Sequence, residues 1–429
     1  MPSVVFRQPS VGCIQTTGAR RPLVNVPRPR RAALAALALG SSIALVGCAT
    51  AGSSEAQSGG DTSSEGPVKI GYIGALSGGS ASLGVPIQHG IELAIDQLNE
   101  AGDLGRELEL VAVDDEADAT KSAAAAQRMV TEDGVVAVLG GPNSGTVLAN
   151  NPIITGAGVV QLITVAQGDN LIDPETPGAD LTYQVTENNS YDVGAIVQLF
   201  EDGAYDAICA VSDTTEYGQG GIQTIRTVFE ERGLEIATAV SHEVNATDLT
   251  PQVLSLRDAG CDAVYLFDYG QDAALFMKTV NQVDWEVPVI GGRGLNQAAF
   301  LSIAGEAGDG IIFPSVIDPE KASAQEFIEA YDAKFGEDDD PAHTFSALGY
   351  DSVMLLAAGL EASGFEGGEA LASALEDVTL EDAASGKEGS TLTYTYGDHR
   401  APSDDFLTFW TIEGGEYQLY SRDVQSTRP

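Results

Sequence analysis

From residue 68 onward, two hydrophobic patterns alternate along the chain. Short runs rich in valine, isoleucine and alanine have the length of buried strands. Longer runs repeat apolar residues every three or four positions, as amphipathic helices do. The first strand is predicted over "VKIGYIGAL", and it leads to a helix in which Ile87, Ile91, Ile95 and Leu98 share one face. Near-continuous apolar strands between helices are typical of parallel sheets covered on both faces.

The alternation occurs in two blocks, which predicts two α/β lobes. It restarts near residue 187, turns helical near residue 317, and ends in a β-rich segment whose "EGGE" indicates a hairpin turn. Chain crossings near residues 187, 315 and 391 would let each lobe collect separate pieces of the chain. We therefore assign residues 68–186 plus 317–391 to lobe 1 and residues 187–316 plus 392–429 to lobe 2.

An apolar run near the start of the chain ends at a cysteine. Residues 32–46 are almost all apolar and follow three arginines within residues 28–31. Such a run suits a signal peptide but is short for a membrane-spanning helix, which needs about 20 residues. The tetrapeptide Leu-Val-Gly-Cys at residues 45–48 resembles a bacterial lipobox. A buried structural cysteine would not explain the basic flank, short apolar run and small residues in this order.

These features predict a lipoprotein signal peptide over residues 1–47 and a lipid on Cys48. The long segment before the basic flank leaves open a start codon further downstream. Residues 48–66 hold the lipidated cysteine and a segment rich in glycine, serine and alanine, which is expected to be a flexible tether. The protein is thus predicted to be extracytoplasmic and anchored to the cell membrane by its lipid.

The charge balance after residue 47 excludes nucleic-acid binding. Removing the signal peptide takes away six arginines and no acid, which leaves 15 basic against 63 acidic residues. A nucleic-acid-binding surface requires the opposite sign. The acids are dispersed along the chain, so they indicate a solvated acidic surface that favours solubility.

Two cysteines, Cys209 and Cys261, remain after the lipobox. They lie in "AICAVSD" and "CDAVYLFD", which are expected to be neighbouring strands. Aligning Asp213 with Asp268 offsets the cysteines by three residues, about 10 Å along a strand, which exceeds the reach of a disulfide. Two buried free thiols are therefore favoured, with a disulfide as the alternative.

Five segments in order resemble one family of proteins. They are "VKIGYIGALSGGSASLG", "VVAVLGGPNSG", "VSDTTEYGQGG", "DAVYLFDYGQDAALFMK" and "VPVIGG". From residue 68 to its end, the chain resembles type I periplasmic binding proteins, and most closely their leucine/isoleucine/valine-binding branch, which serves ABC importers. This resemblance implies two Rossmann-like lobes with parallel sheets, three crossover segments, and capture of a ligand by hinge closure.

The resemblance also implies a set of ligand-contacting residues at the ends of strands. Ligands of open α/β sheets lie beyond the carboxyl ends of the strands, where helix N-termini present unpaired N–H groups. Ser144 could equally serve as a helix N-cap, and Tyr217 and Tyr269 could simply pack at helix starts. The predicted ligand-binding residues are Leu83, Asn143, Ser144, Thr164, Ala166, Gln167, Glu216, Tyr217, Tyr269 and Arg293.

Two positions depart from the family pattern. Many relatives carry Ser-Ala-Thr after the strand that corresponds to "VVQLIT", where this chain has Thr164, Val165, Ala166 and Gln167. In amino-acid-binding relatives the loop after "VPVIGG" often supplies an acid that pairs with the ligand's ammonium group, and here the matching residue is Arg293.

Arg293 leaves two interpretations open. It could point to solvent or pair with one of the chain's many acids. Alternatively, its guanidinium could bind a ligand that carries a carboxylate or amide and no free ammonium. Glu216 and Asp268, near the expected cleft, could instead restore an ammonium site.

No other pattern indicates catalysis, a metal or a cofactor. The acid clusters at residues 114–116 and 338–340 lack the spacing of a calcium loop and are expected to be solvated loop charge. The four histidines are scattered, and neither GxGxxG nor a P-loop follows a strand.

The predicted function is therefore solute binding without chemistry. We expect a monomeric, lipid-anchored protein that captures a branched-chain amino acid, or a related organic acid or amide, for an ABC permease and its ATPase subunits. A ligand-sensing receptor subunit for a signalling partner is the alternative, because the same fold serves that role. An enzyme has the least support.

Overall fold

The computed structural model describes residues 4–6, 66–337, 339–421 and 424. Cys48 and almost all of the predicted signal peptide and tether lie outside these residues. Within the described part of the chain, no helix combines the length and the apolar character needed to cross a membrane.

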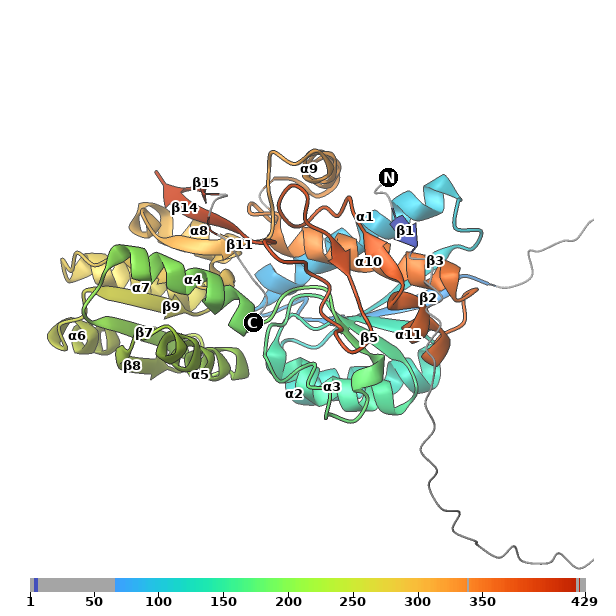
Figure 1. Cartoon of the computed structure of the whole chain (residues 1–429), viewed down its shortest axis with the longest axis horizontal. Coiled ribbons are helices and arrows are strands. Elements are labelled where there is room, and N and C mark those ends of the chain that lie inside the picture. The colour runs from blue at the N-terminus through green and yellow to red at the C-terminus, as the bar shows by residue number, and fades with distance from the viewer. Residues whose placement is uncertain (1–3, 7–65, 338, 422–423, 425–429) are drawn as a thin grey trace, which may run out of the picture. The chain divides into compact units, whose positions relative to one another are not determined.

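The first lobe is built on a five-stranded parallel sheet with the strand order β3-β2-β4-β5-β6. Its helices follow the strands in sequence, as the alternating pattern predicts (Figure 1). The elements are β2 (Val68–Gly74), α1 (Ala81–Ala101), β3 (Leu108–Asp114), α2 (Ala119–Arg128), the π-helical turn Met129–Asp133, β4 (Ala137–Gly140), α3 (Ser144–Gly156), β5 (Val160–Ile163) and β6 (Thr182–Gln184).

The second lobe is built on a seven-stranded sheet with the order β15-β14-β11-β10-β9-β7-β8. Its first five strands along the chain are parallel, and the C-terminal hairpin adds two antiparallel strands beside β11. The elements are α4 (Asn189–Gly203), β7 (Ile208–Asp213), α5 (Glu216–Glu231), β8 (Ile236–His242), α6 (Thr250–Asp258), β9 (Ala263–Phe267), α7 (Gly270–Gln282), β10 (Val289–Gly291), α8 (Ala298–Ala304), β11 (Ile312–Ser315), β14 (Thr408–Glu413) and β15 (Glu416–Ser421).

The chain passes between the two sheets more than once, as the sequence pattern predicts. After β11 it forms α9 (Ala322–Phe335), α10 (Thr344–Ala362) and α11 (Glu369–Leu375). A small antiparallel sheet follows, in which β12 (Val378–Leu380) lies between β1 (Val4–Phe6) and β13 (Leu392–Thr393). The chain then returns to the second lobe at β14. The predicted α/β class with two lobes is confirmed.

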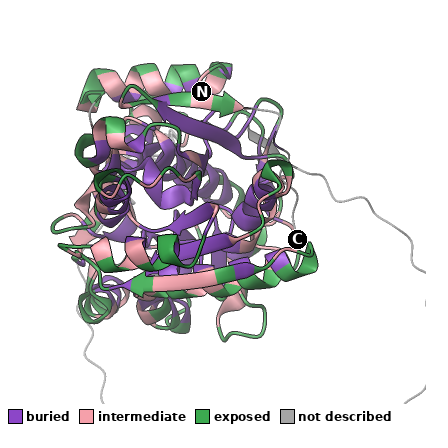
Figure 2. Cartoon of the chain, turned by 90° about the vertical axis from the view of Figure 1, so that its left-hand side faces the viewer, coloured by how far each residue is buried: buried purple, intermediate pink, exposed green. Residues whose placement is uncertain are grey.

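Close contact between α1 and α10 holds the centre of the first lobe together. A Cβ atom on Gly90 would overlap the carbonyl oxygen of Ser346, and one on Gly349 would overlap that of Ile87. The absence of side chains at these two positions lets the helix backbones approach each other. Helix α10 is buried from Thr344 to Leu360, as expected for a helix whose sequence has no polar face. Figure 2 shows that the buried residues follow the strands and the facing sides of the helices.

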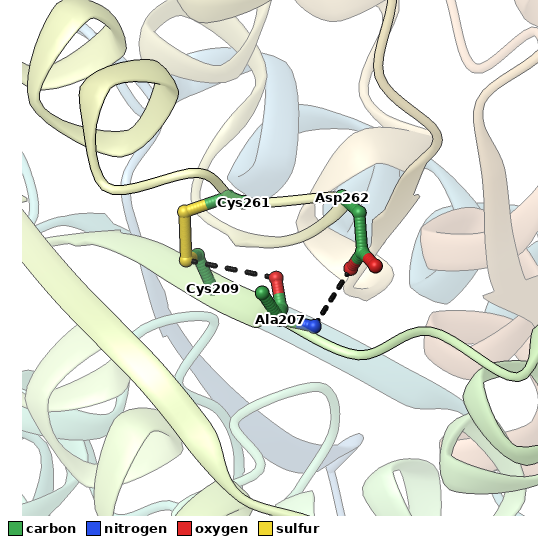
Figure 3. Close-up of a disulfide and its surroundings, with 4 residues drawn as sticks. All are labelled: Ala207, Cys209, Cys261 and Asp262. Atoms are coloured by element: carbon green, nitrogen blue, oxygen red, sulfur yellow. Dashed lines mark hydrogen bonds between the residues drawn. A yellow bond between two sulfur atoms is a disulfide. The ribbon is translucent and has the colours of Figure 1, made fainter.

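The prediction of two free thiols is wrong, because Cys209 and Cys261 form a disulfide with Cα atoms 5.8 Å apart (Figure 3). The three-residue offset itself is correct, since Cys209 is in register with Val264. However, Cys261 precedes β9 and lies in the loop that follows α6. There the chain runs beside β7, where the N–H group of Asp262 donates to the carbonyl of Ala207 at 3.1 Å. Cys261 therefore lies beside Cys209 on the neighbouring segment, although it is three residues before Val264, the residue in register with Cys209.

We expect the disulfide to contribute about 2–4 kcal/mol to the free energy of unfolding, because it closes a long loop in the unfolded chain. Its sequence separation is 52 residues. Chemical denaturation of wild type and of the variant with Cys209→Ser and Cys261→Ser measures the loss. Peptide mapping without reduction should recover the two cysteines in one linked peptide. Alkylation of both cysteines in unreduced, denatured protein would contradict the disulfide.

Candidate ligand-binding site

A cavity of about 350 Å³ lies between the carboxyl ends of the strands of the two lobes. We call it the outer cavity. The first lobe contributes the loops after β2, β3 and β4, and the second lobe those after β7, β8 and β9. This is where α/β sheets bind ligands. The volume falls within the ordinary range for small-molecule sites. It is lined by Gly79, Ser80, Glu116, Ala117, Ala119, Asn143, Ser144, Gly145, Thr146, Thr215, Glu216, Tyr217, Val244, Asn245, Tyr269, Gln271, Asp272 and Gln297.

A second, much smaller space of about 20 Å³ adjoins the outer cavity. We call it the inner cavity. Tyr217 and Tyr269 line both spaces. The inner cavity has room for about one water molecule, so it does not accommodate an amino acid in this conformation. Its lining is Leu83, Pro142, Val165, Ala166, Gln167, Tyr217, Tyr269, Arg293, Gly294 and Phe345.

A larger groove of about 600 Å³ lies elsewhere on the first lobe, beside α1, α9 and α10. Gln97, Phe327 and Tyr350 are among the residues that line it. It is remote from the strand ends, where convergent loops and helix N-termini supply polar groups. We therefore assign the candidate ligand site to the outer and inner cavities.

Nine of the ten residues predicted from the sequence line one of these two cavities. Thr164 is the exception, because it is buried and lines neither cavity. Sequence reasoning missed Glu116, Asp272 and Phe345. Asp272 directly follows the strand-end segment "FDYGQ", which could have indicated it. The outer cavity has Asn143, Ser144 and Glu216, the inner cavity has Leu83, Ala166, Gln167 and Arg293, and Tyr217 and Tyr269 line both.

The start of α3 presents hydrogen-bond donors to the outer cavity. Asn143 occupies the N-cap position and Ser144 is the first helical residue, so the N-cap interpretation of Ser144 is wrong. The Ser144 hydroxyl accepts a hydrogen bond from the N–H group of Gly168 at 3.3 Å and keeps its own hydrogen free to donate. The N–H groups of Ser144 and Gly145 come first in the helix and have no intrahelical acceptor. This arrangement suits a carboxylate or a carbonyl oxygen.

Aromatic rings form the wall between the two cavities. The ring of Tyr217 stacks on Phe267, with centroids 4.2 Å apart, and lies 4.8 Å from the centroid of Tyr269. Burial raises the pKa of Tyr217, so its phenol stays protonated at neutral pH. Both tyrosines pack at helix starts and also line the cavities, so their packing role is compatible with a role in ligand contact.

Arg293 is buried in an ion cluster beside the inner cavity, with 1% of its surface exposed. Its Nη1 donates to Thr186 Oγ1 at 2.8 Å, and its Nη2 pairs with Glu187 and with Asp192, the latter at 3.1 Å. Gln167 donates from Nε2 to Asp192 Oδ2 at 2.7 Å. The interpretation in which Arg293 pairs with the chain's own acids therefore holds, although the cluster is buried rather than at the surface.

Burial favours the neutral forms of the ionisable groups in this cluster. It lowers the pKa of Arg293 to about 9 and raises the pKa of Asp192, against the hydrogen bond from Gln167. Arg293 thus stays charged at neutral pH. Because Glu187 and Asp192 already pair with its guanidinium, Arg293 is a weak partner for a ligand carboxylate.

Asp268 is engaged by His242 and does not line either cavity, so the structure does not support its role in an ammonium site. Its Oδ2 lies 2.7 Å from His242 Nε2, and His242 Nδ1 lies 3.0 Å from the carbonyl oxygen of Glu243. Both ring nitrogens face acceptors, which requires the imidazolium form. Burial alone would lower the pKa of His242, but the hydrogen bond and charge of Asp268 raise it to about 9. Burial raises the pKa of Asp268, and the hydrogen bond and charge of His242 oppose this shift.

The two acid clusters seen in the sequence are only partly solvated. Asp115 and Asp340 are buried, and Asp340 accepts hydrogen bonds from the N–H groups of Phe345 and Ser346 at the start of α10. The expectation of solvated loop charge is wrong for these two residues, because each turns inward to satisfy a loop or helix start. Among the described residues, no group of histidine, cysteine and acidic side chains could hold a metal ion.

Replacing His242 with glutamine should destabilise the protein by about 3 kcal/mol at pH 7, because it leaves a buried carboxylate without its charged partner. The folded-state pKa of His242 is raised, so its stabilisation is complete below the unfolded pKa of about 6.5 and is lost as pH rises through about 9. Urea denaturation at pH 6 and pH 10 measures both effects.

The matched control is His343→Gln, which removes a less buried pair with Asp332 and should cost at most about 1 kcal/mol. A difference between wild type and His242→Gln that stays the same or grows from pH 6 to pH 10 would show that His242 is neutral in the folded protein.

Comparison with known proteins places this architecture in a family. The family model described as periplasmic binding protein matches residues 67–415. The chain is 27% identical over 351 residues to Leu/Ile/Val-binding protein homolog 3 of Brucella melitensis, covering 79% of this chain and 90% of that protein. It is 26% identical over 319 residues to the leucine-, isoleucine-, valine-, threonine- and alanine-binding protein of Pseudomonas aeruginosa, covering 73% of this chain and 83% of the relative.

Solved structures show the same fold. The branched-chain amino acid transporter substrate-binding protein LivJ of Streptococcus pneumoniae, in complex with isoleucine, matches with a TM-score of 0.73 and 25% identity, over 82% of this chain and 98% of that protein. A solute-binding protein of an ABC transporter from R. palustris, in complex with benzoate, matches with a TM-score of 0.74, over 85% of this chain and 98% of that protein. Its 20% identity supports the fold alone.

The family assignment settles the class of protein and its compartment. Periplasmic binding proteins bind solutes outside the cytoplasm and are not enzymes, in agreement with the sequence analysis. The resemblance to the leucine/isoleucine/valine-binding branch is confirmed by the named relatives. This chain, with its cavity between two α/β lobes, therefore belongs to the periplasmic binding protein family.

Proposed function

We propose that this protein is a lipid-anchored solute-binding protein that captures an amino acid, or a related organic acid or amide, for an ABC importer. The observation that carries the proposal is the outer cavity, because loops at the strand ends of both lobes line it. A ligand held there contacts both lobes at once and so favours the closed arrangement.

The chemistry of the first-lobe wall supports an amino-acid-like ligand. The first N–H groups of α3 and the Ser144 hydroxyl supply donors for a carboxylate. The relatives in Brucella melitensis and Pseudomonas aeruginosa are named for branched-chain amino acids, and the LivJ structure holds isoleucine. These names make leucine, isoleucine and valine the first ligands to test.

Hydrogen bonds between the lobes support capture by closure. Ser82 in α1 donates to Gln297 Oε1 of the second lobe at 3.0 Å. On another side of the cleft, Thr224 in α5 donates to Asp169 Oδ2 of the first lobe at 2.6 Å. Opening of the lobes would break both bonds and expose the cavity to solvent, so a bound ligand and these two bonds stabilise the same closed state.

Isothermal titration calorimetry should detect binding of at least one α-amino acid, and Ser144→Ala should weaken it about tenfold through loss of a hydrogen bond to a charged group. Ser363→Ala is the matched control, because Ser363 lies at the end of α10 and its hydroxyl donates to the nearby carbonyl of Leu360. The panel is leucine, isoleucine, valine, their keto-acid analogues and further α-amino acids.

Small-angle scattering of the same samples should show a smaller radius of gyration with bound ligand. Failure of every α-amino acid and keto acid to bind or to raise the Tm would overturn the proposed ligand class. Tight binding with an unchanged radius of gyration would instead overturn capture by closure.

The lipid anchor is tested at Cys48, which lies outside the described residues. Cys48→Ser should abolish incorporation of labelled lipid and release the protein from the membrane fraction, because the acyl chains supply the membrane affinity. Cys13→Ser is the matched control and should remain in the membrane fraction. Full membrane retention of Cys48→Ser would show that the lipobox interpretation is wrong.

A further inference from the structure

Buried hydrogen-bond acceptors without donors line the outer cavity. Asp272 is 4% exposed, and its Oδ2 accepts the N–H group of Asn245 at 2.8 Å. The N–H group of Ala246 also interacts with this carboxylate, but Oδ1 has no partner at hydrogen-bond distance in the described part of the chain. On the first-lobe wall, the side-chain amide of Asn143 interacts with the hydroxyl of Tyr269, but its amide oxygen is buried and has no hydrogen-bond partner among the described residues. Both residues line the outer cavity.

These orphan acceptors indicate what a ligand must supply. Buried polar atoms in folded proteins are nearly always hydrogen-bonded, and an exception at a cavity wall needs a partner from outside the chain. A carboxylate oxygen and an amide oxygen both require N–H or O–H donors. The two atoms belong to different lobes, so a ligand that satisfies both must carry donors at two places.

The charges of the second-lobe wall indicate the sign of the ligand. Glu216 and Asp272 both line the outer cavity, and its lining includes no lysine or arginine. Glu216 is exposed, and in the described part of the chain it forms no ion pair. Since the whole chain has 63 acids against 21 bases, an acidic lining alone would not indicate the charge of the ligand. This wall differs from the rest of the acidic surface because the carboxylate of Asp272 is buried and one of its two oxygens has no hydrogen-bond partner among the described residues.

The other carboxylate and the other cation near the site are already matched. Glu116 lines the outer cavity but pairs with Lys121 at 2.5 Å. Arg293 is held by Glu187 and Asp192. The positive charge of His242 acts on Asp272, but the hydrogen bond of His242 is to Asp268. Among the described residues, the carboxylates of the outer cavity without an ion-pair partner are therefore those of Glu216 and Asp272.

We propose that the outer cavity takes an α-amino acid with a basic side chain, an inference that rests on the proposed function and names its substrate class. The ligand carboxylate lies at the start of α3, and the α-ammonium group donates to the amide oxygen of Asn143. The distal ammonium or guanidinium group pairs with Asp272 and Glu216 on the second lobe. Such a ligand joins the two lobes through its two ends, which links recognition of the side chain to closure.

The test compares lysine with norleucine, which has the same chain length and lacks the distal ammonium group. Titration calorimetry of the purified protein should give lysine or arginine at least tenfold tighter binding than norleucine. Glu216→Gln and Asp272→Asn should each weaken lysine binding at least tenfold and change norleucine binding less than twofold. Glu231→Gln, at the far end of the same helix as Glu216, is the matched control. Circular dichroism and Tm measurements confirm that each variant is folded.

Two outcomes would overturn the inference, and they are distinguishable. If norleucine or leucine binds more tightly than lysine and neither variant affects it, the basic-side-chain class is wrong while capture of amino acids stands. If no α-amino acid binds to wild type, the proposed function fails as well. Because Glu216 is exposed, Glu216→Gln remains informative even if Asp272→Asn does not fold.

Discussion

The buried charge of Arg293 is the constraint on which the centre of this protein depends. A guanidinium removed from water is tolerated only with charged partners and hydrogen bonds close by. Glu187 and Asp192 provide the charges, Thr186 accepts from Nη1, and Gln167 satisfies the remaining oxygen of Asp192. These residues lie where the chain first crosses between the lobes and on the loop after β5, so the cluster fixes both segments beside the inner cavity.

This constraint explains the division of the site into two cavities. Arg293 and Gln167, with the rings of Tyr217 and Tyr269, fill most of the space at the inner end and leave about 20 Å³. The space that remains for a ligand is the outer cavity of about 350 Å³, nearer to the loops after the strands. Arg293, which the resemblance matches to a ligand-pairing acid, thus belongs to an internal ion cluster here. The acids of the outer cavity that have no ion-pair partner among the described residues are Glu216 and Asp272.

The sequence predicts the architecture well because its signals are local. Alternating strands and helices, and polar residues just after strands, depend on neighbours along the chain. The two α/β lobes therefore follow from the pattern, and nine of the ten residues chosen by resemblance line one of the two cavities. The Cys209–Cys261 disulfide does not, because it depends on how a loop runs across a neighbouring strand. The partners of Arg293 and the burial of Asp272 also escape prediction, since tertiary packing alone decides which of the many acids turn inward.

A crystal structure with a bound ligand would locate the ligand relative to Arg293 and so decide between the two cavities. We expect electron density in the outer cavity, between Ser144 and Asp272, with the ion pairs of Arg293 to Glu187 and Asp192 intact. Density in an enlarged inner cavity, with the guanidinium of Arg293 released from its acids and turned onto the ligand, would contradict this expectation.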